Sequence, residues 1–232
     1  MELSVIIPAH NEEETITSVL DEAARELPAA GIAAYELIVV DDGSTDKTAS
    51  RAGEWSRRNP QARVLRHASR KGLGESLRTG YGAATLSHAT WLPGDGQFSP
   101  ADSARLLHSL EGGDIILGDV APSVRARADS PWKLFVSRGL RVVTRALVRD
   151  LVTYTGLMVF RRGILEGMLL SSRTGILNFE LIQRARTRGA TVRRADFTVS
   201  VRPRQAGRSK VSNLRTALDH LIEVARLRWS AG

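Results

Sequence analysis

The chain has 232 residues, of which 42% are hydrophobic and 25% are charged, and its net charge is +8. This length and balance are ordinary for one folded domain, and they exclude an intrinsically disordered chain or a fibrous repeat. No cysteine is present, which excludes disulfides and thiolate metal sites and favours a reducing compartment such as the cytoplasm.

The first eight residues lack the basic and long apolar regions of a signal peptide, and we expect a strand there. No stretch reaches the roughly 18 to 20 apolar residues of a membrane-spanning helix, so none is expected. Charge is divided unevenly: residues 1–119 carry 11 Lys and Arg against 18 Asp and Glu, whereas residues 120–232 carry 22 against 7. The basic half favours phosphate, nucleic acid or an anionic membrane surface as its partner, although an Arg-rich genome would produce the same bias.

Short apolar runs alternate with amphipathic stretches over the first 120 residues. Strands are predicted at residues 3–7, 37–40, 63–66, 90–92 and 114–117. A helix is predicted at residues 12–27, because apolar residues recur there at spacings of 3 and 4. Residues 44–46 can cap a helix that continues to residue 55, and Ser99 and Pro100 supply the cap and first-turn proline of a helix at 101–110. The repeated order of strand and helix predicts a mostly parallel α/β sheet.

Beyond residue 118 the pattern is less regular. The predicted elements are a loop at 119–131, a helix at 132–148, a strand at 157–160, a helix at 179–187, a strand near 198–201, a basic loop and a final helix at 212–229. Arg138, Arg141, Arg145 and Arg149 would form a basic stripe on the first of these helices. The final helix is amphipathic, which suits either a membrane interface or packing on the domain.

Polar motifs follow three of the predicted strands. They are Pro8-Ala9-His10-Asn11-Glu12, Asp41-Asp42-Gly43-Ser44-Thr45-Asp46 and Pro93-Gly94-Asp95-Gly96-Gln97. Ligands of open α/β sheets bind beyond the carboxyl ends of the strands. One such motif alone could be turn or capping chemistry, but three at successive strand ends favour a ligand site.

This ordered set resembles the family 2 glycosyltransferases of the GT-A fold, particularly the dolichyl-phosphate mannose synthase branch. The resemblance spans most of the chain and is carried by residues 5–12, 39–48, 69–82, 93–100 and the late basic segment Arg204-x-x-Gly207-x-Ser209-Lys210. It implies a GT-A (Rossmann-like) α/β fold with a mostly parallel central sheet, flanking helices and a basic C-terminal helical extension. We expect one domain, with a nucleotide-sugar half (1–118), an acceptor half with the basic loop (119–211) and an amphipathic helix (212–232).

The resemblance also implies site residues. Those expected to bind the nucleotide sugar are Pro8, His10, Glu12, Asp41, Asp42, Lys71, Arg78 and Arg138. A carboxylate can accept a hydrogen bond from a base or a ribose hydroxyl, and Asp42 is favoured for the base, while Asp41 has turn capping as its alternative. Arg204 and Lys210 are predicted to be catalytic, in a loop that closes over the donor and stabilises the leaving diphosphate.

The metal motif departs from the family pattern, because Pro93 occupies the position of its first aspartate. The carboxylate of Asp95 and the amide of Gln97 remain, and oxygen ligands suit Mg²⁺ or Mn²⁺ bridging a diphosphate. Asp95 is therefore predicted to be both a metal ligand and a catalytic residue, at a site whose metal affinity is weakened by the missing carboxylate.

The implied function is inverting transfer of a sugar from a UDP- or GDP-linked donor to a polyprenyl phosphate, with peripheral contact at the inner face of an anionic membrane. A soluble small-molecule acceptor is the alternative, and an alcohol acceptor would need a base, for which Asp150 and Glu180 are candidates. Nucleotidyl transfer and non-catalytic nucleic-acid binding are more remote. No stacking motif, zinc spacing or recognition helix supports a nucleic-acid partner.

Overall fold

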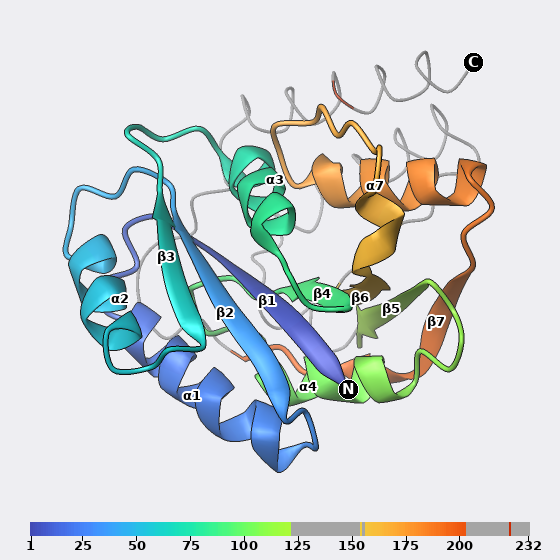
Figure 1. The fold of residues 1–232 in the computed structure, drawn as a ribbon, viewed down its shortest axis with the longest axis horizontal. Helices are drawn as coiled ribbons and strands as arrows, with labels where there is room; N and C mark the ends of the chain where they lie inside the picture. Colours follow the sequence, from blue (N-terminus) through green and yellow to red (C-terminus); the bar gives the residue numbers. More distant parts are fainter. Residues whose placement is uncertain (122–153, 155, 203–222, 224–232) are drawn as a thin grey trace.

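The protein is described by a computed structural model, which covers residues 1–121, 154, 156–202 and 223 (Figure 1). Within these residues, seven strands form one sheet in the order β3-β2-β1-β4-β6-β5-β7. The strands are β1 (Glu2–Ala9), β2 (Ala34–Asp41), β3 (Ala62–Arg66), β4 (His88–Trp91), β5 (Ile115–Val120), β6 (Met158–Arg161) and β7 (Val192–Val199). All neighbours are parallel except β6, which is antiparallel to both β4 and β5. The predicted mostly parallel sheet is confirmed.

Helices cover both faces of the sheet, as Figure 1 shows. One face carries α1 (Ile16–Ala29), α2 (Thr48–Ser56) and α4 (Pro100–His108), and the other carries α3 (Leu73–Ala83) and α7 (Ile176–Thr187); a short 3₁₀ helix, η1 (Arg162–Leu165), follows β6. Along β1, Val5 and Ile7 join the first core, whereas Ile6 joins the second. The continuous apolar run of β1 therefore reflects a parallel strand that is buried on both sides.

Several element ends differ from the predictions for local physical reasons. Helix α1 begins at Ile16 because the Thr15 and Ile16 amides both donate to the Glu12 carbonyl, which makes residues 12–15 a turn. Strand β7 begins earlier than predicted, since it is an edge strand whose alternate side chains are charged and exposed, so its apolar signal is weak. The predicted start of α4 is confirmed, with the Ser99 hydroxyl accepting from the Ala101 amide.

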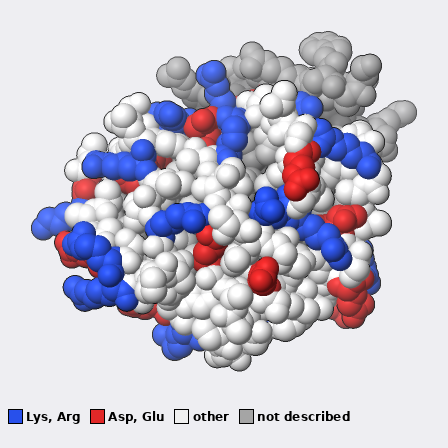
Figure 2. Space-filling model, in the orientation of Figure 1, with Lys and Arg blue, Asp and Glu red and all other residues white. Residues whose placement is uncertain are grey.

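The basic stripe of residues 138–149 and the final helix of residues 212–229 fall outside the described residues, so the predicted C-terminal extension stays a prediction. Among the residues that the structure describes, no helix is both long and apolar enough to span a membrane. On the face shown in Figure 2, basic side chains of the described residues lie among acidic ones.

Candidate functional site

The loops after β1 and β2 are joined by hydrogen bonds between side chains and backbone. The Asn11 amide donates to the Ser44 hydroxyl at 2.9 Å, and the Asn11 side-chain oxygen accepts from the Thr45 amide at 2.9 Å. The Glu12 amide donates to the Thr48 hydroxyl at 2.8 Å, and two further bonds of this kind join the loops. Asn11 has a φ of 52°, a left-handed conformation that Asn tolerates. The first two sequence motifs therefore form one continuous wall.

The third motif lies against the same wall. The Gly94 amide donates to the Pro8 carbonyl at 3.2 Å, and the Gly94 carbonyl accepts from the Thr15 hydroxyl at 2.7 Å. A Cβ atom at Gly94 would lie 3.3 Å from both the Ala9 Cβ and the Pro8 oxygen, so a glycine permits this close approach. The structure thus brings together all three strand-end motifs that the sequence predicted.

Asp95 lies at this junction and is 5% exposed, with one carboxylate oxygen accepting from the Gln97 amide at 3.1 Å. The Gln97 carbonyl accepts from the Arg202 amide at 2.8 Å, and Phe98 forms an isolated β-bridge with Val201. The chain that leads into the predicted basic loop is therefore held beside the metal motif. Three predicted cationic site residues, Arg138, Arg204 and Lys210, lie outside the described residues.

Asp42 anchors the start of α3. Its carboxylate is buried and accepts from the His67 ring and from the Lys71 and Gly72 amides, each at 2.8 Å. The other ring nitrogen of His67 lies 3.0 Å from the Thr79 hydroxyl. A carboxylate has about four acceptor positions, and three are used here, so contact with a nucleotide base stays a prediction. His67 was not predicted, although it directly follows β3 and so lies at a strand end like the three motifs.

Asp41 is fully buried beneath the same wall. One oxygen accepts from the Ser44 amide at 3.3 Å, which is the turn capping expected as its alternative role. The other lies 3.1 Å from the Arg66 guanidinium, close enough for an ion pair but too poorly aligned for a hydrogen bond. Asp41 as a ligand of the nucleotide stays a prediction.

The other predicted nucleotide ligands lie along this edge. The His10 ring donates to the Asp42 carbonyl at 2.9 Å, while Pro8 and Glu12 are half-buried. The Lys71 side chain is exposed, and Arg78 pairs with Glu75 and donates to the Ser172 carbonyl. The Arg78 guanidinium is thus already bound by protein groups, and its contact with a diphosphate stays a prediction.

Glu180, a candidate base for an alcohol acceptor, is fully buried and accepts hydrogen bonds from both Ser171 and Ser172 and from the Arg184 guanidinium. Burial alone would raise the pKa of Glu180, but the bonds from Ser172, Ser171 and Arg184 outweigh burial and lower it. This geometry argues against Glu180 as a base. The other candidate, Asp150, lies outside the described residues.

The described residues contain no cluster of three or more His, Cys, Asp or Glu side chains that could hold a metal by themselves. Asp95 and Gln97 instead offer one carboxylate and one amide oxygen at the edge of the wall. This donor set fits Mg²⁺ or Mn²⁺, since Mg²⁺ commonly uses one or two carboxylates together with substrate phosphates and water.

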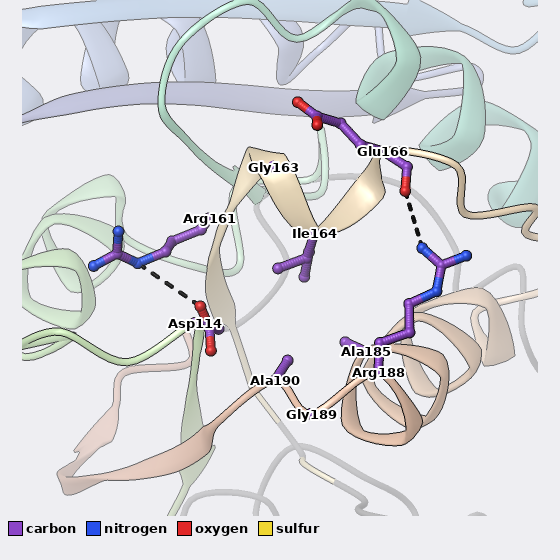
Figure 3. Close-up of a pocket in the computed structure, with 9 residues that line it drawn as sticks. All are labelled: Asp114, Arg161, Gly163, Ile164, Glu166, Ala185, Arg188, Gly189 and Ala190. Carbon is purple, nitrogen blue, oxygen red and sulfur yellow. Dashed lines mark hydrogen bonds and ion pairs between the residues drawn. The ribbon is translucent and has the colours of Figure 1, made fainter.

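A pocket of about 400 Å³ lies at the opposite, amino edge of the parallel strands (Figure 3). Ile164 and Ala190 point into it, whereas the Arg161 guanidinium lies beside Asp114 at its side. Arg188 donates to the backbone carbonyls of residues 166 and 167. Asp114, Arg161 and Arg188 of this pocket are thus bonded to other protein groups, and the convergent motifs lie at the other edge.

The fold and the site define an α/β protein with a polar ligand site at the carboxyl edge of its sheet. Comparison with known proteins identifies the protein family. The family model described as "Glycosyl transferase family 2" matches residues 4–167. A dolichol-phosphate mannosyltransferase of Pyrococcus furiosus is 28% identical, covering 99% of this chain and 64% of the relative. An uncharacterized glycosyltransferase of Mycobacterium tuberculosis is 32% identical, covering 95% of each.

Solved structures share the fold. Glucosyl-3-phosphoglycerate synthase from Mycobacterium tuberculosis, in complex with phosphoglyceric acid, has a TM-score of 0.69 at 23% identity and covers 98% of this chain and 79% of that chain. A mannosyltransferase from Pyrobaculum calidifontis has a TM-score of 0.65 at 16% identity and covers 99% of this chain and 73% of that chain.

The chain belongs to glycosyl transferase family 2. The predicted family, GT-A fold and enzyme class are confirmed, and the two remote alternatives are wrong because a glycosyltransferase family accounts for most of the chain.

Proposed function

We propose that the protein transfers a sugar from a nucleoside diphosphate to a polyprenyl phosphate. The observation that carries the proposal is the convergence of the three strand-end motifs, with Gly94 bonded to Pro8 and Asp95 at the junction. Besides the Pyrococcus relative, a polyprenol monophosphomannose synthase of Mycolicibacterium smegmatis is 29% identical and covers 94% of this chain and 85% of the relative. The chain spans 64% of the length of the Pyrococcus protein, so the activity of that whole protein is carried over only as a proposal.

The wall formed by the first two motifs would bind the nucleoside. His10 and Glu12 place polar groups along it, with Asp41 beneath, and the carboxylates of Glu12 and Asp41 would accept from base N–H groups or ribose hydroxyls. The bonds between Asn11 and residues 44–45 hold the wall in place before a ligand arrives. Such preorganisation reduces the entropy that binding would otherwise cost.

Asp95 and Gln97 would hold Mg²⁺ or Mn²⁺ together with the diphosphate. Two structural neighbours were solved with Mn²⁺, one with UDP and the other with GDP-Man. When bound, a divalent cation would neutralise the negative charge that develops on the leaving diphosphate. The Arg202 amide fixes Gln97 through its carbonyl, so this side of the site is positioned by the same segment that leads to Arg204.

Cationic side chains of this chain would also neutralise the charge on the leaving diphosphate. Arg204 and Lys210 follow the anchored Arg202 in sequence, and Lys71, Arg78 and Arg138 complete the proposed set. Their charges would stabilise the leaving group as the bond between the anomeric carbon and the diphosphate breaks. Direct attack by an acceptor oxygen on the opposite face of the sugar forms the new bond and inverts the configuration.

A phosphate acceptor suits a site in which we identify no general base among the residues that the structure describes. Phosphate monoesters are ionised near neutral pH, since their second pKa is about 6, and can attack without losing a proton. The basic second half of the chain would attract such an acceptor and the cytoplasmic surface of an anionic membrane. A soluble acceptor is the second candidate, favoured by the structural similarity to a synthase solved with phosphoglyceric acid.

The test has two stages that use the purified chain. First, a thermal-shift panel of nucleoside diphosphates with and without Mn²⁺ should identify the base of the donor, because a ligand that binds the native state raises Tm. Second, the matching nucleotide sugars should give a sugar-linked lipid with undecaprenyl or dolichyl phosphate, measured by mass spectrometry. No stabilisation by any nucleoside diphosphate would overturn the donor site, and transfer to phosphoglyceric acid but not to lipid would favour the second candidate.

A further inference from the structure

A turn at residues 171–174 contacts α7 and also α3, whose start meets Asp42 of the candidate site. The Ser172 carbonyl accepts from Arg78 of α3 at 2.7 Å, and the Arg173 carbonyl accepts from the Gly74 amide at 2.9 Å. Glu180 of α7 fixes the other side of the turn through the Ser171 and Ser172 amides. A Cβ atom at Gly74 would lie 2.4 Å from the Arg173 carbonyl carbon, so turn and helix are in direct backbone contact. The position of this turn therefore constrains the start of α3.

Glu223 is the one residue beyond 202 that the structure describes, and its carboxylate binds this turn. One oxygen accepts from the Arg173 amide at 2.7 Å, and the other accepts from the Thr174 amide at 3.2 Å and the Thr174 hydroxyl at 2.6 Å. These groups immediately precede α7, where unpaired amides and the helix dipole favour a negative charge. A residue distant in sequence thus supplies the partner for consecutive amides of the turn.

The start of α3 leads directly to the donor wall. The Lys71 and Gly72 amides donate to Asp42, and Gly72 has a φ of 98°, which favours glycine. Contacts are therefore continuous from Glu223 through Arg173 to α3 and Asp42. The bond between Glu223 and the Arg173 amide is exposed, whereas the bonds of Thr174 to Glu223 and of the Lys71 and Gly72 amides to Asp42 are half-buried. Gly74 is buried in direct contact with the Arg173 backbone, so a displacement of the turn would be passed to the start of α3.

We infer that Glu223 is a positioning residue for the donor site, which rests on the proposed function of that site. By fixing residues 173–174, its carboxylate fixes the start of α3 and the two amides that meet Asp42. Loss of the carboxylate would loosen this end of α3 and weaken binding of the nucleoside diphosphate. Since Glu223 contacts neither the reacting atoms nor the metal ligands, the effect falls on donor KM more than on kcat.

The test compares Glu223→Ala and Glu223→Gln with Asp114→Ala. Asp114 is a matched control, because its carboxylate also accepts from a threonine amide and hydroxyl, those of Thr191, at 2.8 and 2.9 Å, but at the opposite edge of the sheet. Nucleoside diphosphate Kd, donor KM and kcat are measured for each, with amide hydrogen exchange over residues 70–77. We expect Glu223→Ala to raise Kd and KM roughly 5- to 10-fold, a size typical of coupling between sites, and to accelerate that exchange. Glu223→Gln, which keeps an acceptor oxygen, should give a smaller rise.

The outcomes separate the two proposals. Unchanged exchange over residues 70–77 in Glu223→Ala, or faster exchange with unchanged Kd, would overturn the positioning role while the donor site stands. An equal rise of Kd in Asp114→Ala would also overturn it, because the effect would then be a general loss of stability. A wild-type protein that binds no nucleoside diphosphate would overturn the donor site, and the role of Glu223 with it.

Discussion

At the carboxyl edge of the sheet, the buried carboxylate of Asp42 accepts hydrogen bonds from His67 and two consecutive loop amides. At the amino edge, the buried carboxylate of Glu36 accepts them from the Ser4 hydroxyl and from the amide and hydroxyl of Thr85. Each carboxylate accepts three hydrogen bonds, but Asp42 holds loops that form the wall of the candidate site, whereas Glu36 joins β2 to β1 and to the loop before β4. A buried, hydrogen-bonded carboxylate is therefore not by itself evidence of a catalytic or ligand-binding role. Its edge of the sheet decides what it supports.

The largest expected difference between the edges comes from Asp95→Ala. Removing the single carboxylate of the metal motif should lower kcat about 10²- to 10³-fold, the size seen when one electrostatic stabiliser of a transition state is removed. The measurement is steady-state transfer with saturating donor and Mn²⁺, beside thermal unfolding of the same protein. Asp114→Ala at the amino edge is the control and should transfer at the wild-type rate. Near wild-type turnover in Asp95→Ala would remove Asp95 from the site.

Asp42→Asn and Glu36→Gln compare the two anchors directly. Each change leaves a buried donor poorly satisfied and should lower the free energy of unfolding by about 1–3 kcal/mol, measured by urea denaturation. Only Asp42→Asn should also raise donor KM, because only its partners include the Lys71 and Gly72 amides beside the proposed nucleotide wall. Equal donor KM values in the two variants would show that Asp42 is as remote from the donor as Glu36.

The same two edges show what the sequence could predict. The local sequence marks the ends of these strands, because an apolar run stops and Pro8, Asp41 or Pro93 follows. The three motifs and their convergence could therefore be predicted from the topology of parallel sheets. The partners that hold the motifs could not, because His67 and Thr15 reach them only through tertiary packing. The antiparallel insertion of β6 was unpredicted for a similar reason, since its apolar run is equally compatible with either direction. Glu223 follows no strand and belongs to no motif, so no local signal could connect it with the turn at 171–174.

Pro93→Asp tests the metal motif at the carboxyl edge, because it adds the carboxylate that the family pattern has at this position. Pro93 is half-buried, two residues before Asp95, so a second oxygen donor there would raise affinity for a hard cation. We expect a several-fold lower Mn²⁺ concentration for half-maximal transfer, obtained by titrating Mn²⁺ at fixed donor. Pro93→Ala is the matched control, since it removes the ring without adding a ligand. Identical Mn²⁺ curves for Pro93→Asp and Pro93→Ala would mean that this position does not face the cation.

The smallest effect concerns acid stability at the amino edge. Burial alone would raise the pKa of Glu36, but hydrogen bonds from Ser4 and Thr85 and the Arg63 guanidinium outweigh it and lower the pKa below its ordinary value of about 4.5. A carboxylate whose pKa is lower in the folded chain contributes its full stability above the unfolded pKa and loses it as the pH falls through the folded one. The difference in unfolding free energy between wild type and Glu36→Gln should therefore be constant from pH 7 to about 5 and narrow below pH 4.5. Urea denaturation across this range measures it, and a difference that widens on acidification would reverse the assigned direction. Donor KM of Glu36→Gln at pH 7 should stay at the wild-type value, because the carboxylate supports the sheet at the edge away from the proposed site.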